Sequence, residues 1–222
     1  MTEQTKGQTI NACFEFVAKC SAEVQNLAET LKKLFSDELD RQGTSLPFAA
    51  AGDWNKGTWA ADEIVDWLCT GVSYSLPLKR GKGNFKTERW LTIQANLMGD
   101  FLLPDSKEPI LHVYLWDDAC SFEDETYNAF PYAAEDEMRA TVERERLIRY
   151  ADDRMGAESE IHWLDMWAYC LRLTDLQTPG DLMRLVVQPA LKLLRGRPVE
   201  EALPDNLLES GLMKLDKDWI ES

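Results

Sequence analysis

WLTIQANLM, residues 90–98, is the stretch that decides the fold. Apolar and polar side chains alternate along it, which predicts a β-strand with two different faces. The segment ILHVYLW, residues 110–116, alternates in the same way, and so do residues 72–78, where Pro77 would confine the strand to a sheet edge. Together these segments predict a three-strand antiparallel meander over about residues 72–116.

The two faces of this predicted sheet differ in composition. One face is apolar, with Leu91, Ile93, Ala95 and Leu97 beside Leu111, Val113 and Leu115. The other face mixes large aromatic rings with neutral hydrogen-bonding groups, as the centre of a protein interface does. The predicted partner-binding row is Trp90, Thr92, Gln94, Asn96, His112, Tyr114 and Trp116, with Asp117 and Asp118 as its charged rim. The alternative is that a helix covers this face and its polar groups hydrogen-bond internally.

Residues 8–41 predict one long amphipathic helix, and Gly43 is a suitable stop. Its apolar residues recur at alternating spacings of three and four: Ile10, Cys13, Val17, Cys20, Val24, Leu27, Leu31 and Leu34. Such a helix is about 51 Å long, whereas a compact chain of this size is about 45 Å across. We therefore expect the helix to break, to overhang the body, or to form a homodimer.

A short helix is predicted before the sheet, and the last third of the chain predicts more helices. The expected segments are 59–69, capped by Thr58, then about 134–155, about 159–176, and a helix from Thr178 to about Leu194 that bends at Pro189. The predicted fold is therefore α+β and mostly helical: a long N-terminal helix, a small meander and a C-terminal helical bundle. We expect one domain over 1–222, helical in 1–70, sheet in 71–117 and helical in 131–222.

Bulk composition narrows the class of protein. The chain has 222 residues and a net charge of −15, which speaks against direct binding to nucleic acid. No apolar run approaches the ~20 residues that span a bilayer, and the N-terminus lacks the pattern of a secretory signal. The five cysteines are widely spaced, which favours reduced thiols and a cytoplasmic location. We expect no cofactor and no membrane partner.

Two groups could carry chemistry. Asp117, Asp118, Glu123, Asp124 and Glu125 could hold Mg²⁺ near His112, with the basic segment 79–89 attracting an anionic substrate. This arrangement would make a metal-dependent hydrolase or nuclease-like enzyme, but the spacing matches no known metal loop. His162 shares a predicted helical face with Glu158 and Asp165, which fits either acid–base work or an exposed polar stripe.

The leading functional prediction is a non-catalytic acidic cytosolic protein that neutralises, escorts or regulates a basic protein partner. Immunity proteins, antitoxins, secretion chaperones and polyanion mimics of bacteria and phages share this composition, which is an analogy and not a family match. The acidic patches would steer the partner and the aromatic row would bind it. The alternatives are the metal-dependent enzyme and a subunit that joins a larger assembly through helix 8–41.

Overall fold

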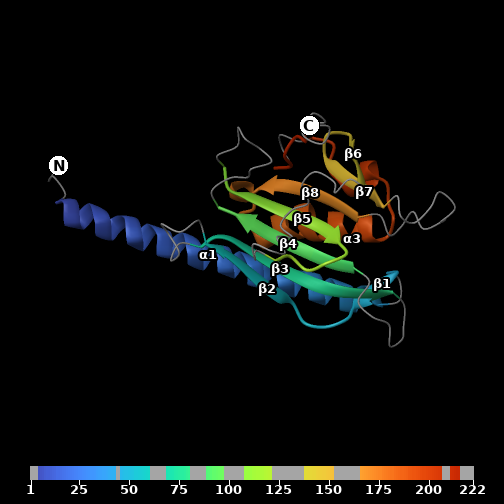
Figure 1. The fold of residues 1–222 in the computed structure, drawn as a ribbon, viewed down its shortest axis with the longest axis horizontal. Coiled ribbons are helices and arrows are strands. Elements are labelled where there is room, and N and C mark those ends of the chain that lie inside the picture. The colour runs from blue at the N-terminus through green and yellow to red at the C-terminus, as the bar shows by residue number, and fades with distance from the viewer. Residues whose placement is uncertain are drawn as a thin grey trace.

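The computed structural model describes residues 5–43, 46–60, 69–80, 89–97, 108–121, 138–152, 166–206 and 211–215. A long helix lies along one side of a twisted sheet and extends well beyond it (Figure 1). The helices are α1 (Lys6–Gln42), η4 (Leu173–Asp175), α2 (Pro179–Asp181), η5 (Leu182–Val187), α3 (Gln188–Leu194) and α4 (Val199–Ala202). The strands are β1 (Phe48–Ala50), β2 (Asn55–Ala60), β3 (Cys69–Arg80), β4 (Arg89–Asn96), β5 (Ile110–Trp116), β6 (Met138–Glu143), β7 (Leu147–Asp152) and β8 (Met166–Arg172).

The strands form one eight-stranded sheet in the order β1-β3-β4-β5-β8-β7-β6, and β2 pairs with β3 beside β1. All of these pairings are antiparallel. The neighbours β3, β4 and β5 follow each other as the alternation predicts. The fold-class prediction is nevertheless wrong, because a large antiparallel sheet replaces both the three-strand meander and the C-terminal helical bundle.

Pro77 does not place β3 at a sheet edge, contrary to the prediction. On one side β3 pairs with β4 along its length, and on the other side it pairs first with β2 and then with β1. The pairing with β2 reaches Ser75, and the pairing with β1 begins at Leu78. Pro77 lies in this gap, where its carbonyl accepts a hydrogen bond from the Ala51 N–H at 2.8 Å. A proline is tolerated here because neither neighbour needs its missing N–H.

Three strands occupy the region where the sequence predicted helices 134–155 and 159–176. In the described parts of that region the chain forms β6, β7 and β8 instead. The β6–β7 turn explains part of the error, because Arg144 and Glu145 both have positive φ there, of 51° and 56°. Hairpin turns of that hand usually carry asparagine and glycine, so this turn has no sequence signature. Thr58 likewise lies in β2 and caps no helix.

The strand β8 was predicted to be helical for a different reason. Its sequence MWAYCLR is buried from Met166 to Leu171, on both faces of the sheet. A strand buried on both faces loses the alternation of apolar and polar residues, and a short apolar run of this kind does not distinguish a strand from a buried helix.

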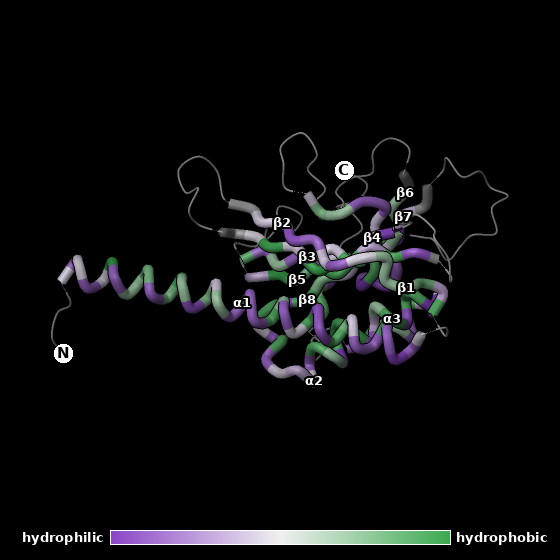
Figure 2. The backbone as a smooth tube through the Cα atoms, turned by 90° about the horizontal axis from the view of Figure 1, so that it is seen from below, coloured by the Kyte–Doolittle hydropathy of each residue, from purple (hydrophilic) through white to green (hydrophobic). Residues whose placement is uncertain are grey.

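The apolar face of the sheet carries the main core. Figure 2 shows α1, α2 and α3 on the same side of the sheet. There α1 buries Val24, Ala28, Leu31, Phe35 and Leu39 against the sheet. The C-terminal helices pack beside α1, and the Tyr169 hydroxyl on β8 donates a hydrogen bond to the Val186 carbonyl at 2.8 Å.

The ends of the helices follow the sequence signals. Thr5 and Gln8 form a capping box at the start of α1, and Gly43 ends the helix with φ of 48°. Thr178 and Asp181 form a second capping box, and the chain is helical from there to Leu194, as predicted. The π-helical turns of η5 lie directly before Pro189, whose ring nitrogen has no proton to donate.

Candidate functional site

The predicted partner-binding row lies on the face of the sheet opposite α1. The register between β4 and β5 places Trp90 across from Trp116, Thr92 across from Tyr114 and Gln94 across from His112. The predicted residues therefore do lie in one row on the same face of the sheet, but the prediction that this row faces outward is wrong. The exposed fractions are 0% for Thr92, 1% for Gln94, 6% for Asn96, 1% for His112 and 1% for Tyr114.

The buried polar side chains of this row bind one another. The Tyr114 hydroxyl donates to Gln94 Oε1 at 3.0 Å, and Gln94 Nε2 donates to Asn96 Oδ1 at 3.0 Å. Asn96 Nδ2 lies 3.4 Å from His112 Nε2. Buried polar groups are costly unless they are hydrogen-bonded, so this chain of contacts is what makes a polar sheet interior stable.

The segment after β5 turns back over the same face. The Cys120 N–H donates to Ser75 Oγ at 3.0 Å, and Ser75 Oγ also accepts from Thr92 Oγ1 at 2.8 Å. The Cys120 thiol points to Gln94 Oε1, with 3.7 Å between sulfur and oxygen. Burial raises the pKa of the Cys120 thiol. A nucleophilic cysteine needs a lowered pKa, so this thiol is suited to donating a hydrogen bond and not to attacking a substrate.

A second hydrophobic cluster closes this face at the β5–β8 end. It contains Ile110, Tyr114, Cys120, Ile148, Tyr150, Met166, Ala168, Cys170 and Leu215. The ring of Trp116 meets that of Tyr150 edge-on, with centroids 5.1 Å apart. The C-terminal segment also joins the sheet, since the Met213 N–H donates to the Cys170 carbonyl at 3.0 Å and the Leu215 N–H to the Glu145 carbonyl at 2.9 Å. The polar face is thus an internal layer of the protein.

The structure describes only some of the remaining predicted site residues. Trp90 and Trp116 are half-buried, and Asp117 and Asp118 are exposed. Glu123, Asp124 and Glu125 lie outside the described residues, as do Glu158, His162 and Asp165. Among the described residues there is no group of three or more histidine, cysteine, aspartate or glutamate side chains that could hold a metal ion.

The most exposed apolar surface of the described chain lies on the first half of α1. We call Lys6–Glu23 the arm and the remainder of the described chain the body. The arm projects away from the sheet in both views (Figures 1 and 2). Ile10 is 58% exposed, Phe14 52% and Phe16 68%, and these are the large hydrophobic side chains that stand exposed in the described part of the protein. Single exposed apolar residues are ordinary, but three on one projecting helix mark an interaction surface.

The arm continues the stripe by which α1 binds its own sheet. Within the body, α1 buries positions 24, 28, 31, 35 and 39. Stepping back from Val24 by the same spacings leads to Cys20, Val17, Cys13 and Ile10, which lie on the same side of the helix. One apolar stripe therefore runs the whole length of α1, and the sheet covers only its C-terminal half.

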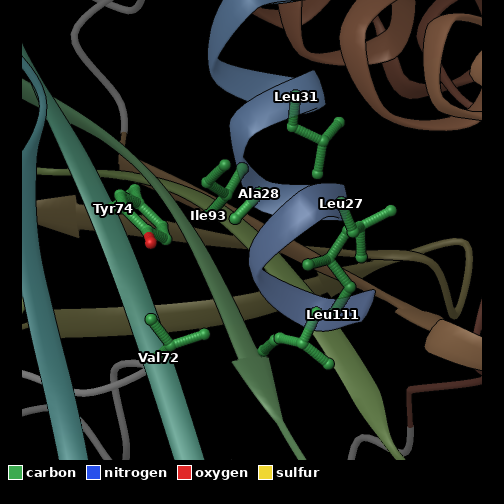
Figure 3. A pocket seen from close by; sticks show the side chains of 9 residues that line it. Leu27, Ala28, Leu31, Val72, Tyr74, Ile93 and Leu111 are labelled. Carbon is green, nitrogen blue, oxygen red and sulfur yellow. The ribbon is translucent and has the colours of Figure 1, made fainter. Parts of the chain in front are cut away.

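A groove of about 190 Å³ lies where the arm meets the body. Its lining residues are Ser21, Val24 and Gln25 of α1, Lys56 and Thr58 of β2, Val72 and Tyr74 of β3, and Leu97 after β4. Further along α1 the packing closes: Figure 3 shows Leu27, Ala28 and Leu31 of the helix beside Val72, Tyr74, Ile93 and Leu111 of the strands. The space left there is about 10 Å³, the size of a single water at most. The groove is thus the open end of the seam between α1 and the sheet.

Sequence reasoning anticipated the overhang from the length of the helix, but it did not locate the groove. The groove depends on β2, and the sequence had placed residues 59–69 in a helix. The arm itself had a signal, because its apolar spacing is as regular as that of the buried half while its residues include few charges.

Comparisons with known proteins identify no relatives: no family model, no curated protein and no solved structure matches this chain. Within the described residues, no helix has the length and apolar character needed to cross a membrane.

Proposed function

We propose that this protein is a docking protein without catalytic activity, which binds another polypeptide through the arm. The observation that supports this function is the apolar stripe of α1, whose second half already binds a β-sheet and whose first half exposes Ile10. Phe14 and Phe16 are exposed on the two flanks of this stripe. An amphipathic helix that lays its apolar face on a partner is a common mode of protein recognition. This proposal develops the alternative in which helix 8–41 joins the protein to an assembly.

The chemistry of the arm favours a protein surface over a lipid surface. Helices that lie on membranes carry many lysines and arginines on the polar side. The arm has two lysines, Lys6 and Lys19, and two glutamates, Glu15 and Glu23, so it carries no net charge. A chain of net charge −15 is also repelled by anionic headgroups.

A basic partner remains a prediction, but it needs a different contact surface from the one predicted. The buried row on β4 and β5 is not accessible to it. Asp117 and Asp118 are exposed at the end of β5 and stay available for electrostatic steering. The arm, being apolar and neutral, contributes affinity through burial of apolar area and does not depend on the charge of the partner.

The test places a photoreactive phenylalanine analogue on the arm in living cells. The probe replaces Ile10, which lies on the stripe, and the matched control replaces Ala12, which is exposed two positions further on and lies almost opposite on the helix. We expect an adduct with a polypeptide from position 10 and none from position 12. The proposal fails if position 10 yields no polypeptide adduct, or if its adducts are lipids.

A further inference from the structure

The body imposes a direction on a second copy of α1 that binds the arm. The stripe of the arm faces the same side of α1 on which the sheet lies, and Val24 is the first position of α1 that is buried. A second copy that lay on the stripe parallel to α1 would carry its own C-terminal half and its sheet against the first sheet beyond Val24. A second copy that runs antiparallel brings only its first turns to the body.

The arm itself meets this requirement. It is a helix that begins at Lys6, it carries the complementary apolar stripe, and its two lysines and two glutamates leave it neutral. We propose that two copies of the chain pair through their arms, antiparallel, so that the N-terminal end of each arm enters the groove of the other copy. This inference rests on the proposed docking function and names its partner as a second copy.

The length of the arm fits such a pair. From Lys6 to Glu23 the arm spans about 27 Å at 1.5 Å per residue. With the two-fold axis at Val17, Ile10 of one copy lies across from Val24 of the other, and Phe14 lies across from Cys20. Val24 is a lining residue of the groove. The interface is isologous, as in most homodimers, and the apolar groove is completed by the partner's Ile10.

Electrostatics favour the same arrangement. Because the arm is neutral, the whole net charge of −15 belongs to the rest of the chain. Two such bodies repel each other at close range, and antiparallel arms hold them at opposite ends of the paired helices. With the two-fold axis at Val17, the bodies begin about 21 Å apart along the helices, which exceeds the Debye length of about 8 Å at physiological ionic strength, so little of the repulsion remains.

Sedimentation equilibrium of the purified full-length chain tests whether a second copy binds the stripe. We expect a concentration-dependent dimer for the unaltered chain, loss of the dimer in Val17→Asp, and retention of it in Ala18→Asp. The two substitutions add the same charge to neighbouring positions of the same helix, and only Val17 lies on the stripe. Equal far-ultraviolet circular dichroism and equal melting temperatures show that the fold is kept. A monomer at about 100 μM, or equal loss of dimer in both variants, overturns the inference.

The direction of pairing is tested by disulfide formation in chains whose Cys13 and Cys20 are replaced by serine. Val17→Cys lies at the two-fold axis, so its thiol meets its own copy and the dimer becomes covalent. Ile10→Cys lies about 20 Å from its own copy in antiparallel arms and should not link, whereas parallel arms bring the two together. Linkage through position 10 overturns the antiparallel arrangement, and so does a dimer that links through neither position.

The two proposals fail separately. If the purified chain is monomeric while the probe at position 10 still captures a different polypeptide in cells, the self-pairing is wrong and the docking function stands. If the captured adduct has the mass of two copies of this chain, both proposals are supported. If neither experiment detects association, both are wrong.

Discussion

Gln94 connects the two halves of the buried polar layer. Its carbonyl oxygen accepts from the Tyr114 hydroxyl and from the Cys120 thiol, and its amide nitrogen donates to Asn96. Leucine has a similar volume but no polar atoms. We expect Gln94→Leu to lower the free energy of unfolding by about 1–3 kcal/mol, because it leaves the Tyr114 hydroxyl buried without its acceptor. Urea unfolding measures the change.

The control is a double-mutant cycle with Tyr114→Phe, which removes the hydroxyl that Gln94→Leu would leave without its acceptor. The double variant should then be more stable than the sum of the two single changes implies, by about 0.5–3 kcal/mol. Additive effects would mean that the two side chains contribute independently and that the hydrogen bond seen between them is not important for stability.

Alkaline pH should destabilise the protein through its buried acidic side chains. Burial raises the pKa of the Cys120 thiol, and it also raises the pKa of Tyr150 and of Tyr169. Below about pH 7.5 these groups are neutral in both states and their contribution is fully present. Above it the unfolded chain ionises first, so the free energy of unfolding falls as pH rises. We expect a steep loss between pH 8 and pH 10.5, and a shallower one in Tyr150→Phe. A slope unchanged in that variant would contradict this assignment.

The polar face of Gln94 and His112 also shows which part of the structure the sequence could not predict. Alternation correctly placed Gln94 and His112 on one face, because strand geometry is local. Whether that face is covered depends on Cys120 folding back onto Ser75 and on Leu215 joining the β6–β7 turn. These contacts join positions far apart in the chain, and no periodic pattern records them.

The C-terminal segment docks onto β8 at a position that only glycine fits. Gly211 has φ of 69°, and an added Cβ would lie 2.9 Å from Asp175 Cβ. We expect Gly211→Ala to cost about 1–3 kcal/mol of stability through backbone strain and this clash. Hydrogen exchange should show the loss locally, as faster exchange of the Met213 and Leu215 amides.

The matched control is Gly52→Ala, at which the nearest atom to the added Cβ is Pro77 Cγ at 3.4 Å and φ is not positive. It should leave exchange at Met213 unchanged. If Gly211→Ala behaves like this control, the segment does not depend on the special conformation of Gly211.

Among the helices and strands, the correct predictions came from signals between residues that are close in the sequence. The bounds of β5, the helix start at Thr178 and the stop at Gly43 are set by neighbouring residues. The prediction for β8 was wrong because this strand is buried on both faces, so its residues do not alternate between apolar and polar. The arm was half-predicted: the length of the helix left a break, an overhang or a homodimer open, and its free stripe became visible only once Val24 was known as the first buried position.

The protein combines an acidic body with a neutral arm. Ionic strength should therefore change how strongly two copies associate. At about 10 mM ionic strength screening extends over ~30 Å, comparable to the length of the arm, and the two bodies of a dimer repel each other. At about 150 mM it falls to ~8 Å and the repulsion disappears. We therefore expect the dissociation constant of the homodimer, measured by sedimentation, to fall several-fold between these conditions.

A partner attracted by the acidic patches responds in the opposite sense, because added salt screens attraction between unlike charges. The sign of the salt dependence thus separates the two kinds of association without any substitution. Self-association that weakens with salt would mean that charge pairs, and not the apolar stripe of α1, hold the copies together. The Val17→Asp chain should show no association at either ionic strength, since screening cannot restore an apolar contact at the centre of the stripe.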